Sequence, residues 1–177
     1  MALVRLFRRE PESETQNPIH FDGRLTGLLK DDHRRLIRQL QQLRKLVSRG
    51  QYRALPAKLD EFRSLLQTHL MTENVRLYGY LSYALGPYSN DARRAADFRR
   101  EMYTLGHAVM TFVRRYHETE ISAETAGVFG KELTDLAVLL VRRIRREETE
   151  LFPLYRPPHA QTRRAEGTVT PLWAARG

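Results

Sequence analysis

Thr68-His69-Leu70-Met71-Thr72-Glu73-Asn74 carries a histidine and a glutamate four residues apart. On an α-helix, this spacing places the imidazole and the carboxylate on one face, with their Cβ atoms about 5–6 Å apart. Apolar side chains share that face on both sides of the pair, namely Phe62, Leu66, Leu77 and Tyr80. The pair is therefore predicted to point into a core. Because burying a lone carboxylate is costly, its partner must be a metal, a ligand or another charged side chain.

The composition indicates one compact soluble domain. The chain has 177 residues, of which 41% are hydrophobic and 29% are charged, and this length suffices for a single core. The longest apolar run, Leu136–Val141, is far shorter than the roughly 18–20 residues that span a bilayer, and residues 1–9 lack the apolar core of a signal peptide. The absence of cysteine excludes disulfides, thiolate metal sites and cysteine nucleophiles. A cytoplasmic location is expected by default.

The chain is basic, with 30 Lys and Arg against 21 Asp and Glu and a formal charge of +9. Such a balance permits binding to nucleic acid, anionic lipid or an acidic protein surface. The arginines, however, are spread over every predicted helix and are not interleaved with aromatic residues, unlike a groove for single-stranded nucleic acid. We interpret them as a solvated surface. Nucleic acid is not expected as a partner, and no membrane span is expected.

Four amphipathic helical patterns with short breaks run along the chain. They cover about Leu25–Ser48, about Pro56–Tyr83, a stretch that begins at Ser89, Asn90 or Asp91, and a stretch from near Ser122 to Pro153. These patterns predict an all-α, up-down-up-down four-helix bundle over residues 23–157. Residues 1–22 and 158–177 are polar or rich in small residues and are predicted to be flexible tails.

Three segments resemble the hemerythrin-like, or HHE cation-binding, family. They are Asp31-Asp32-His33, His69-x-x-x-Glu73 and Glu147-Glu148-x-x-Leu151-Phe152-Pro153-Leu154, in the first, second and fourth helices. The resemblance covers roughly residues 24–157 and implies a hemerythrin-like bundle that holds a non-haem di-iron centre. By position, it implies His33, His69, Glu73 and Glu147 as metal ligands. Imidazoles and carboxylates suit iron, and facing helices of a bundle can direct them to one internal point.

The sequence departs from this family at two expected ligand positions. The fourth helix carries Arg143 where the family has a histidine, and a guanidinium has no lone pair for a metal. The third helix has a histidine, His107, but at about 100° per residue its apolar stripe directs Gly106 inward and His107 away. Either this helix is rotated or kinked, so that His107 is a fifth ligand, or a glycine occupies the ligand position. Such a set is compatible with two irons, with one, or with none.

The same residues allow a metal-free arrangement. Arg143 lies one turn before Glu147 and could reach Glu73 across the bundle. A guanidinium with two carboxylates and two histidines would form a buried network that satisfies itself. The sequence leaves the metal-bound and the metal-free arrangements open.

Two classes of function follow. The resemblance implies a metal-binding protein that senses or handles iron, O2 or NO. No phosphate loop or nucleophile set is present, so an enzyme is not expected, and any catalysis would run through the metal. The alternative is a metal-free bundle that acts on a protein partner. Leu59-x-x-Phe62…Leu77-Tyr78 and Arg143-x-x-x-Glu147-Glu148 are loosely similar to the anti-sigma-70 regulators of gammaproteobacteria, helical bundles that bind a transcription initiation factor.

Overall fold

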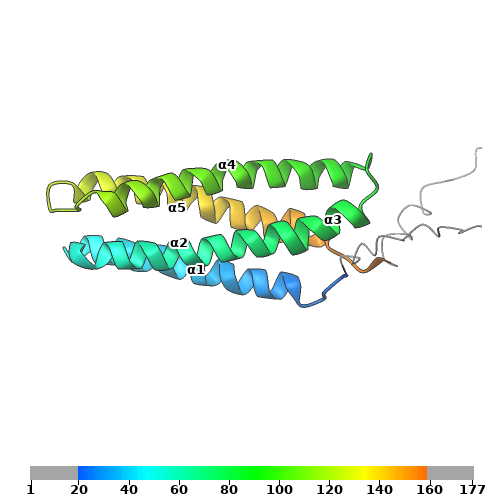
Figure 1. Cartoon of the computed structure of the whole chain (residues 1–177), viewed down its shortest axis with the longest axis horizontal. Helices are drawn as coiled ribbons and strands as arrows, with labels where there is room; N and C mark the ends of the chain where they lie inside the picture. Colours follow the sequence, from blue (N-terminus) through cyan, green and yellow to red (C-terminus); the bar gives the residue numbers. More distant parts are fainter. Residues whose placement is uncertain (1–19, 159–177) are drawn as a thin grey trace, which may run out of the picture.

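The computed structural model describes residues 20–158 and shows an all-α bundle (Figure 1). Its helices and helical turns are, in chain order, α1 (Leu25–Ser48), η1 (Tyr52–Ala54), α2 (Leu55–Thr72), η2 (Glu73–Tyr78), α3 (Gly79–Ala84), α4 (Asn90–Glu118), α5 (Ala126–Arg146), η3 (Glu147–Leu151) and η4 (Phe152–Leu154). The run α2–η2–α3 forms one continuous rod, as does α5–η3–η4, and these two rods pack lengthwise with α1 and α4. The predicted all-α four-helix bundle is confirmed.

The helices end at residues that the sequence marks as boundaries. Gly50 adopts a φ of 67° just after α1, a left-handed conformation that glycine tolerates best. Pro56 lies in the first turn of α2, where its missing N–H is not needed. The Ala92 N–H donates a hydrogen bond of 3.0 Å to the Ser89 side chain, which caps α4. These boundaries keep the connections short, so successive rods run antiparallel.

A layer of polar side chains divides the core into two apolar clusters. The five residues of this polar layer come from three of the four rods and are His33, His69, Glu73, Arg143 and Glu147. Along α1, for example, His33 lies between Leu29 of one apolar cluster and Leu36 of the other. The polar layer therefore crosses the middle of the bundle and has buried hydrocarbon on both sides.

The predicted tails fall almost entirely outside the described residues. Of the segment 1–22, only residues 20–22 are described. The Phe21 ring stacks on the Tyr155 ring at a centroid distance of 4.9 Å, and the Asp22 N–H donates to the Tyr155 hydroxyl at 2.8 Å, so the approach to α1 is docked on the bundle. Within the described part of the chain, no helix is long and apolar enough to cross a membrane.

Candidate metal centre

All five side chains of the polar layer are almost completely buried, with exposed fractions of 4% or less. His33 projects from α1, His69 from the last turn of α2, and Glu73 from the next turn of the same rod. Arg143 and Glu147 lie one turn apart on the fourth rod. Since charged and polar groups in a core need partners, their mutual distances decide what the layer can do.

His33 is held between two carboxylates. Its Nδ1 lies 2.8 Å from Oε1 of Glu148, and its Nε2 lies 3.1 Å from Oε2 of Glu147. A ring nitrogen that donates to Glu148 carries a proton, so in the neutral ring Nε2 keeps its lone pair. Burial by itself lowers the pKa of His33, but the hydrogen bonds and charges of Glu147 and Glu148 outweigh burial and raise it.

His69 lies against His33, with a distance of 4.8 Å between the ring centroids. Its Nδ1 is 3.8 Å from Oδ2 of Asp32. Burial, followed by the charge of His33, lowers the pKa of His69 to about 4. His69 is therefore a neutral imidazole at neutral pH, which is the form that binds metals.

Glu147 joins the two histidines to the arginine. Its Oε2 faces His33, whereas its Oε1 lies 2.7 Å from Nη2 of Arg143. One ligand atom each from His33, His69 and Glu147 lie within 4.8 Å of one another, so these three residues form a possible cation site. The Glu147 carboxylate thus has this site on one side and a guanidinium on the other.

Arg143 is anchored by groups other than Glu147 as well. Its Nη2 donates to the Tyr78 hydroxyl at 3.2 Å and to the Phe98 carbonyl oxygen at 3.0 Å. Its guanidinium carbon lies 4.5 Å from the centroid of the Phe98 ring, a favourable cation–π arrangement. The positive charge of Arg143 is therefore fixed at this point of the bundle.

Glu73 is not part of the fully hydrogen-bonded, metal-free network that the sequence allows. Neither of its carboxylate oxygens has a hydrogen-bond partner within the described part of the chain. Arg143 pairs with Glu147 and not with Glu73, and its Nε and Nη1 are themselves unpartnered there. Burial, together with the negative charge of Glu147, raises the pKa of Glu73 well above its ordinary value, against the opposing charge of Arg143. The layer therefore has unused capacity for a polar or cationic occupant.

Comparison with known families identifies the domain. The model of the hemerythrin HHE cation-binding domain matches residues 24–155, which is most of the chain. The chain belongs to the hemerythrin HHE cation-binding domain family. No significant match is found among curated proteins or solved structures.

The structure locates both of the sites at which the sequence departs from the hemerythrin pattern. On α4, Gly106 is buried and faces Leu70 of α2, whereas His107 is exposed and lies in a surface pocket beside Met110 and Tyr103. The helix is not rotated at this point, and the structure does not bring His107 into the polar layer. A Cβ atom on Gly106 would lie 3.2 Å from Cδ1 of Leu70, so Leu70 takes part of the space that a larger residue would need.

Two π-helical turns at the centre were not foreseen from the sequence. One begins at Glu73 and the other at Glu147, the two carboxylates of the polar layer. A π turn inserts an extra residue into a helix, which changes the direction of the following side chains, and such turns are frequent at functional sites. No residue pattern in either rod announces them, because neither Glu73–Tyr78 nor Glu147–Leu151 contains a proline or a glycine that would mark an irregular turn.

The motifs quoted from the sequence contain Asp32, Tyr78 and Glu148, but no contact with the layer was predicted for these outer partners. Asp32 and Glu148 each adjoin a predicted ligand in the sequence, but each contacts a histidine of another rod. Asp32 of α1 approaches His69 of α2, and Glu148 of η3 is hydrogen-bonded to His33 of α1. An acidic residue beside a predicted ligand is the signal that would have suggested such a role, since histidine ligands usually donate their second nitrogen to a carboxylate.

Four of the five predicted metal ligands lie together, and the chemistry of these groups fits one metal ion. Both carboxylate oxygens of Glu73 remain buried in the layer without a hydrogen-bond partner in the described part of the chain. Neutral imidazole and carboxylate are suitable ligands for iron. The residues do not fit two ions, because the guanidinium of Arg143 already brings a fixed positive charge to the far side of Glu147.

Proposed function

We propose that this hemerythrin-family domain binds a single non-haem iron ion, with the Arg143 guanidinium in place of a second ion. His33, His69 and Glu147 would hold the ion, and Glu73 supplies a further carboxylate to the same layer. Two imidazoles and one carboxylate are the donor set typical of mononuclear non-haem iron(II). Iron bound in this way supplies open coordination positions for small ligands such as O2 or NO.

The shared carboxylate of Glu147 is the observation that carries the proposal. Its two oxygens face different partners, Nε2 of His33 at 3.1 Å and Nη2 of Arg143 at 2.7 Å. Carboxylates commonly bridge two cations in bundle metal centres. Here the guanidinium of Arg143 takes the place of one of those cations, so Oε2 of Glu147, on the side of His33, is left for one ion.

A binding or sensing role, rather than catalysis, agrees with the burial of the layer. None of its five side chains is more than 4% exposed, and apolar clusters cover it at both ends of the bundle. A diatomic molecule can reach such a site through small fluctuations of the packing, whereas an organic substrate would require the rods to separate. We therefore propose that the protein senses or handles O2, NO or iron without being an enzyme.

The test is metal analysis of protein purified anaerobically and reconstituted with Fe(II). We expect about one iron per chain, the number of cation sites left beside Arg143. No bound iron after reconstitution would overturn metal binding, and two irons per chain with the absorption bands of an oxo-bridged pair would overturn the one-ion centre. The Arg143→His variant is expected to bind iron more tightly or to take up a second ion.

A matched pair of histidine variants makes this test specific. His33→Gln removes a nitrogen at the centre of the layer and should abolish iron binding. His107→Gln removes an exposed imidazole outside the layer and should leave it unchanged. Loss of iron in both variants, or in neither, would contradict the assignment.

A metal-free regulator is the second candidate, and the anchoring of Arg143 favours it. This guanidinium has an ion pair, two hydrogen bonds and an aromatic face, all supplied by the bundle itself, so the bundle has an internal cation. In that case we propose that the domain acts through a protein partner such as a transcription factor. Recovery of a transcription initiation factor in a pull-down, with no dependence on added iron, would support this candidate, and an empty pull-down at mild salt would count against it.

A further inference from the structure

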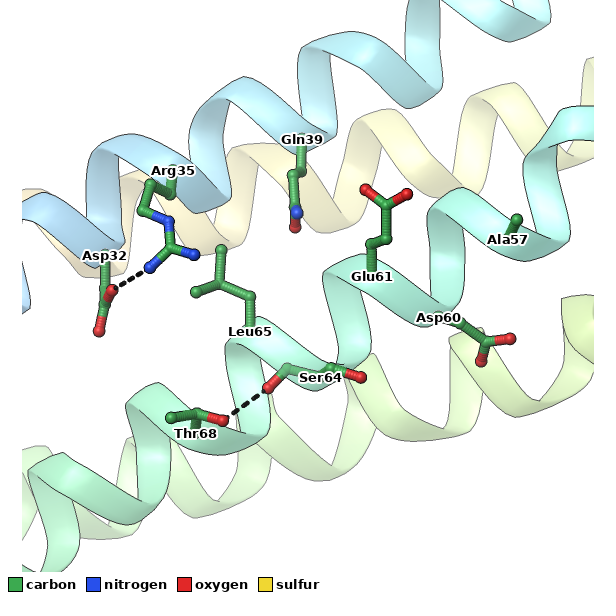
Figure 2. A pocket seen from close by; sticks show the side chains of 9 residues that line it. All are labelled: Asp32, Arg35, Gln39, Ala57, Asp60, Glu61, Ser64, Leu65 and Thr68. Atoms are coloured by element: carbon green, nitrogen blue, oxygen red, sulfur yellow. Dashed lines mark hydrogen bonds and ion pairs between the residues drawn. The ribbon is translucent and has the colours of Figure 1, made fainter.

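A groove with a volume of about 600 Å3 runs between α1 and α2, next to the polar layer. Figure 2 shows Asp32, Arg35 and Gln39 projecting from α1 and Ser64 and the other lining residues from α2. The two charged residues nearest the polar layer are paired, with 3.1 Å between Nη1 of Arg35 and Oδ1 of Asp32. This pair is partly exposed to solvent, unlike any member of the layer.

Asp32 also reaches the layer through its second oxygen. Its Oδ2 is 3.8 Å from Nδ1 of His69, a nitrogen that is buried and has no hydrogen-bond partner in the described part of the chain. A separation of 3.8 Å is longer than a hydrogen bond. One carboxylate is therefore shared between a guanidinium in the groove and an imidazole in the core, and the guanidinium is the closer of the two.

We propose that Asp32 is a positioning residue for His69, and that Arg35 competes with His69 for this carboxylate from the groove. The inference rests on the proposed iron site, because it assigns to that site a means of adjusting its affinity from the surface. The contacts of Asp32 with Arg35 and His69 can also be tested in the metal-free protein.

The neighbouring His33 has a carboxylate within hydrogen-bond distance of its outer nitrogen, which is the arrangement that His69 lacks. Glu148 lies 2.8 Å from Nδ1 of His33, and Nε2 of the same ring faces Glu147. A carboxylate on the outer nitrogen fixes the orientation of the ring and makes the inner nitrogen a stronger donor, and loss of such a partner typically weakens metal binding 10–100-fold. His69 has the corresponding carboxylate in Asp32, but Arg35 holds it outside hydrogen-bond distance.

The chain offers matched controls for both parts of the proposal. Asp31 and Arg34 precede Asp32 and Arg35 by one position, form their own exposed ion pair, and do not line the groove. Asp31→Asn changes the net charge by the same amount as Asp32→Asn, and Arg34→Gln by the same amount as Arg35→Gln. Differences within each pair therefore report the position of the side chain and not the overall charge.

The measurement is the Fe(II) dissociation constant, obtained anaerobically by competition with a chelator. Asp32→Asn should weaken binding by about 10–100-fold, whereas Asp31→Asn should change it little. Arg35→Gln should tighten binding, because Asp32 is then free to approach His69, and Arg34→Gln should not. Equal affinities within both pairs would overturn the proposal. Urea unfolding of each variant establishes that it is folded before its affinity is compared.

A second measurement separates this inference from the proposed function. If the wild-type protein takes up no iron, the proposed function fails, and the inference is then read from the ring 15N chemical shifts of His69 in the metal-free protein. Arg35→Gln should increase, and Asp32→Asn should decrease, the population of His69 that carries its proton on Nδ1. Ring shifts that do not respond to either substitution would overturn the inference on their own.

Discussion

Replacing Arg143 by methionine tests whether its guanidinium balances the buried charge of Glu147. Methionine keeps much of the volume of the arginine stem but removes the ion pair of 2.7 Å with Glu147 and the hydrogen bonds to Tyr78 and Phe98. Glu147 would then be a buried carboxylate, 1% exposed, without its cation. Removing one partner of a buried ion pair typically costs about 3–5 kcal/mol, which is a large part of the total stability of a domain.

The assays are thermal and urea unfolding of the metal-free protein at neutral pH, in the presence of a chelator. For a chain of this size, 1 kcal/mol corresponds to roughly 2–4 °C in Tm, so we expect Arg143→Met to lower the Tm by roughly 6–20 °C. The neighbouring Arg142 is exposed, and Arg142→Met should change the stability by less than about 0.5 kcal/mol. This control separates the loss of a buried cation from the loss of one positive charge.

A double-mutant cycle identifies the cause of the loss. Glu147→Gln alone leaves the guanidinium buried without its counter-ion and should also destabilise the protein. The combined variant Arg143→Met/Glu147→Gln removes both charges and should be more stable than the sum of the two single losses predicts, because neither charge is left unpaired. A loss below about 1 kcal/mol for Arg143→Met, or simple additivity of the two substitutions, would refute the argument.

Three further predictions concern the other members of the layer and its border. The folded pKa values of His33 and Glu73 are raised above their ordinary values of 6.5 and 4.5. Each group therefore contributes stability that the metal-free protein loses as the pH rises from that ordinary value through the folded one. Urea unfolding at increasing pH should show this decline, and Glu73→Gln should reduce it. The pKa of His69 is lowered to about 4, so stability should also fall as the pH drops from about 6.5 toward 4, and a His69→Gln variant that keeps the same acid slope would contradict this. Gly106→Ala should cost stability while Leu70 is present, because of the close Cβ contact at 3.2 Å, but should gain up to about 1 kcal/mol of helix propensity in a Leu70→Ala background.

The fold and the members of the polar layer were predictable because helical periodicity carries them. His33 and Glu147 lie on the apolar stripes of their helices, as do His69 and Glu73, and all four are buried. Periodicity also directed Gly106 inward and His107 outward, which is what the structure shows. A side chain's inward direction depends on local spacing alone, so it can be read from one helix at a time.

The pairing within the layer was not predictable, because it depends on how the rods are set relative to one another. From the sequence, Arg143 lay one turn before Glu147 and could also reach Glu73, but of these two carboxylates it pairs only with Glu147 in the described structure. The shift of one helix relative to another and the π turns at Glu73 and Glu147 change these distances by several ångströms, and no spacing rule encodes them. Outer partners such as Asp32 are missed for the same reason, since they act across a helix pair.

The charge of the polar layer links its metal-bound and metal-free arrangements. With both histidines neutral, the carboxylates of Glu73 and Glu147 contribute two negative charges and Arg143 one positive charge, so the layer lacks one positive charge. Burial and then the charge of Glu147 raise the pKa of Glu73, and, against burial, the hydrogen bonds and charges of Glu147 and Glu148 raise the pKa of His33. Taking up a proton at either group reduces the deficit. A divalent ion held by His33, His69 and Glu147 would supply the missing charge and one more, and it would have to displace the proton that His33 otherwise favours. Proton uptake and the proposed binding of iron would therefore compete at one site, and the pH dependence of iron uptake would measure the balance between them.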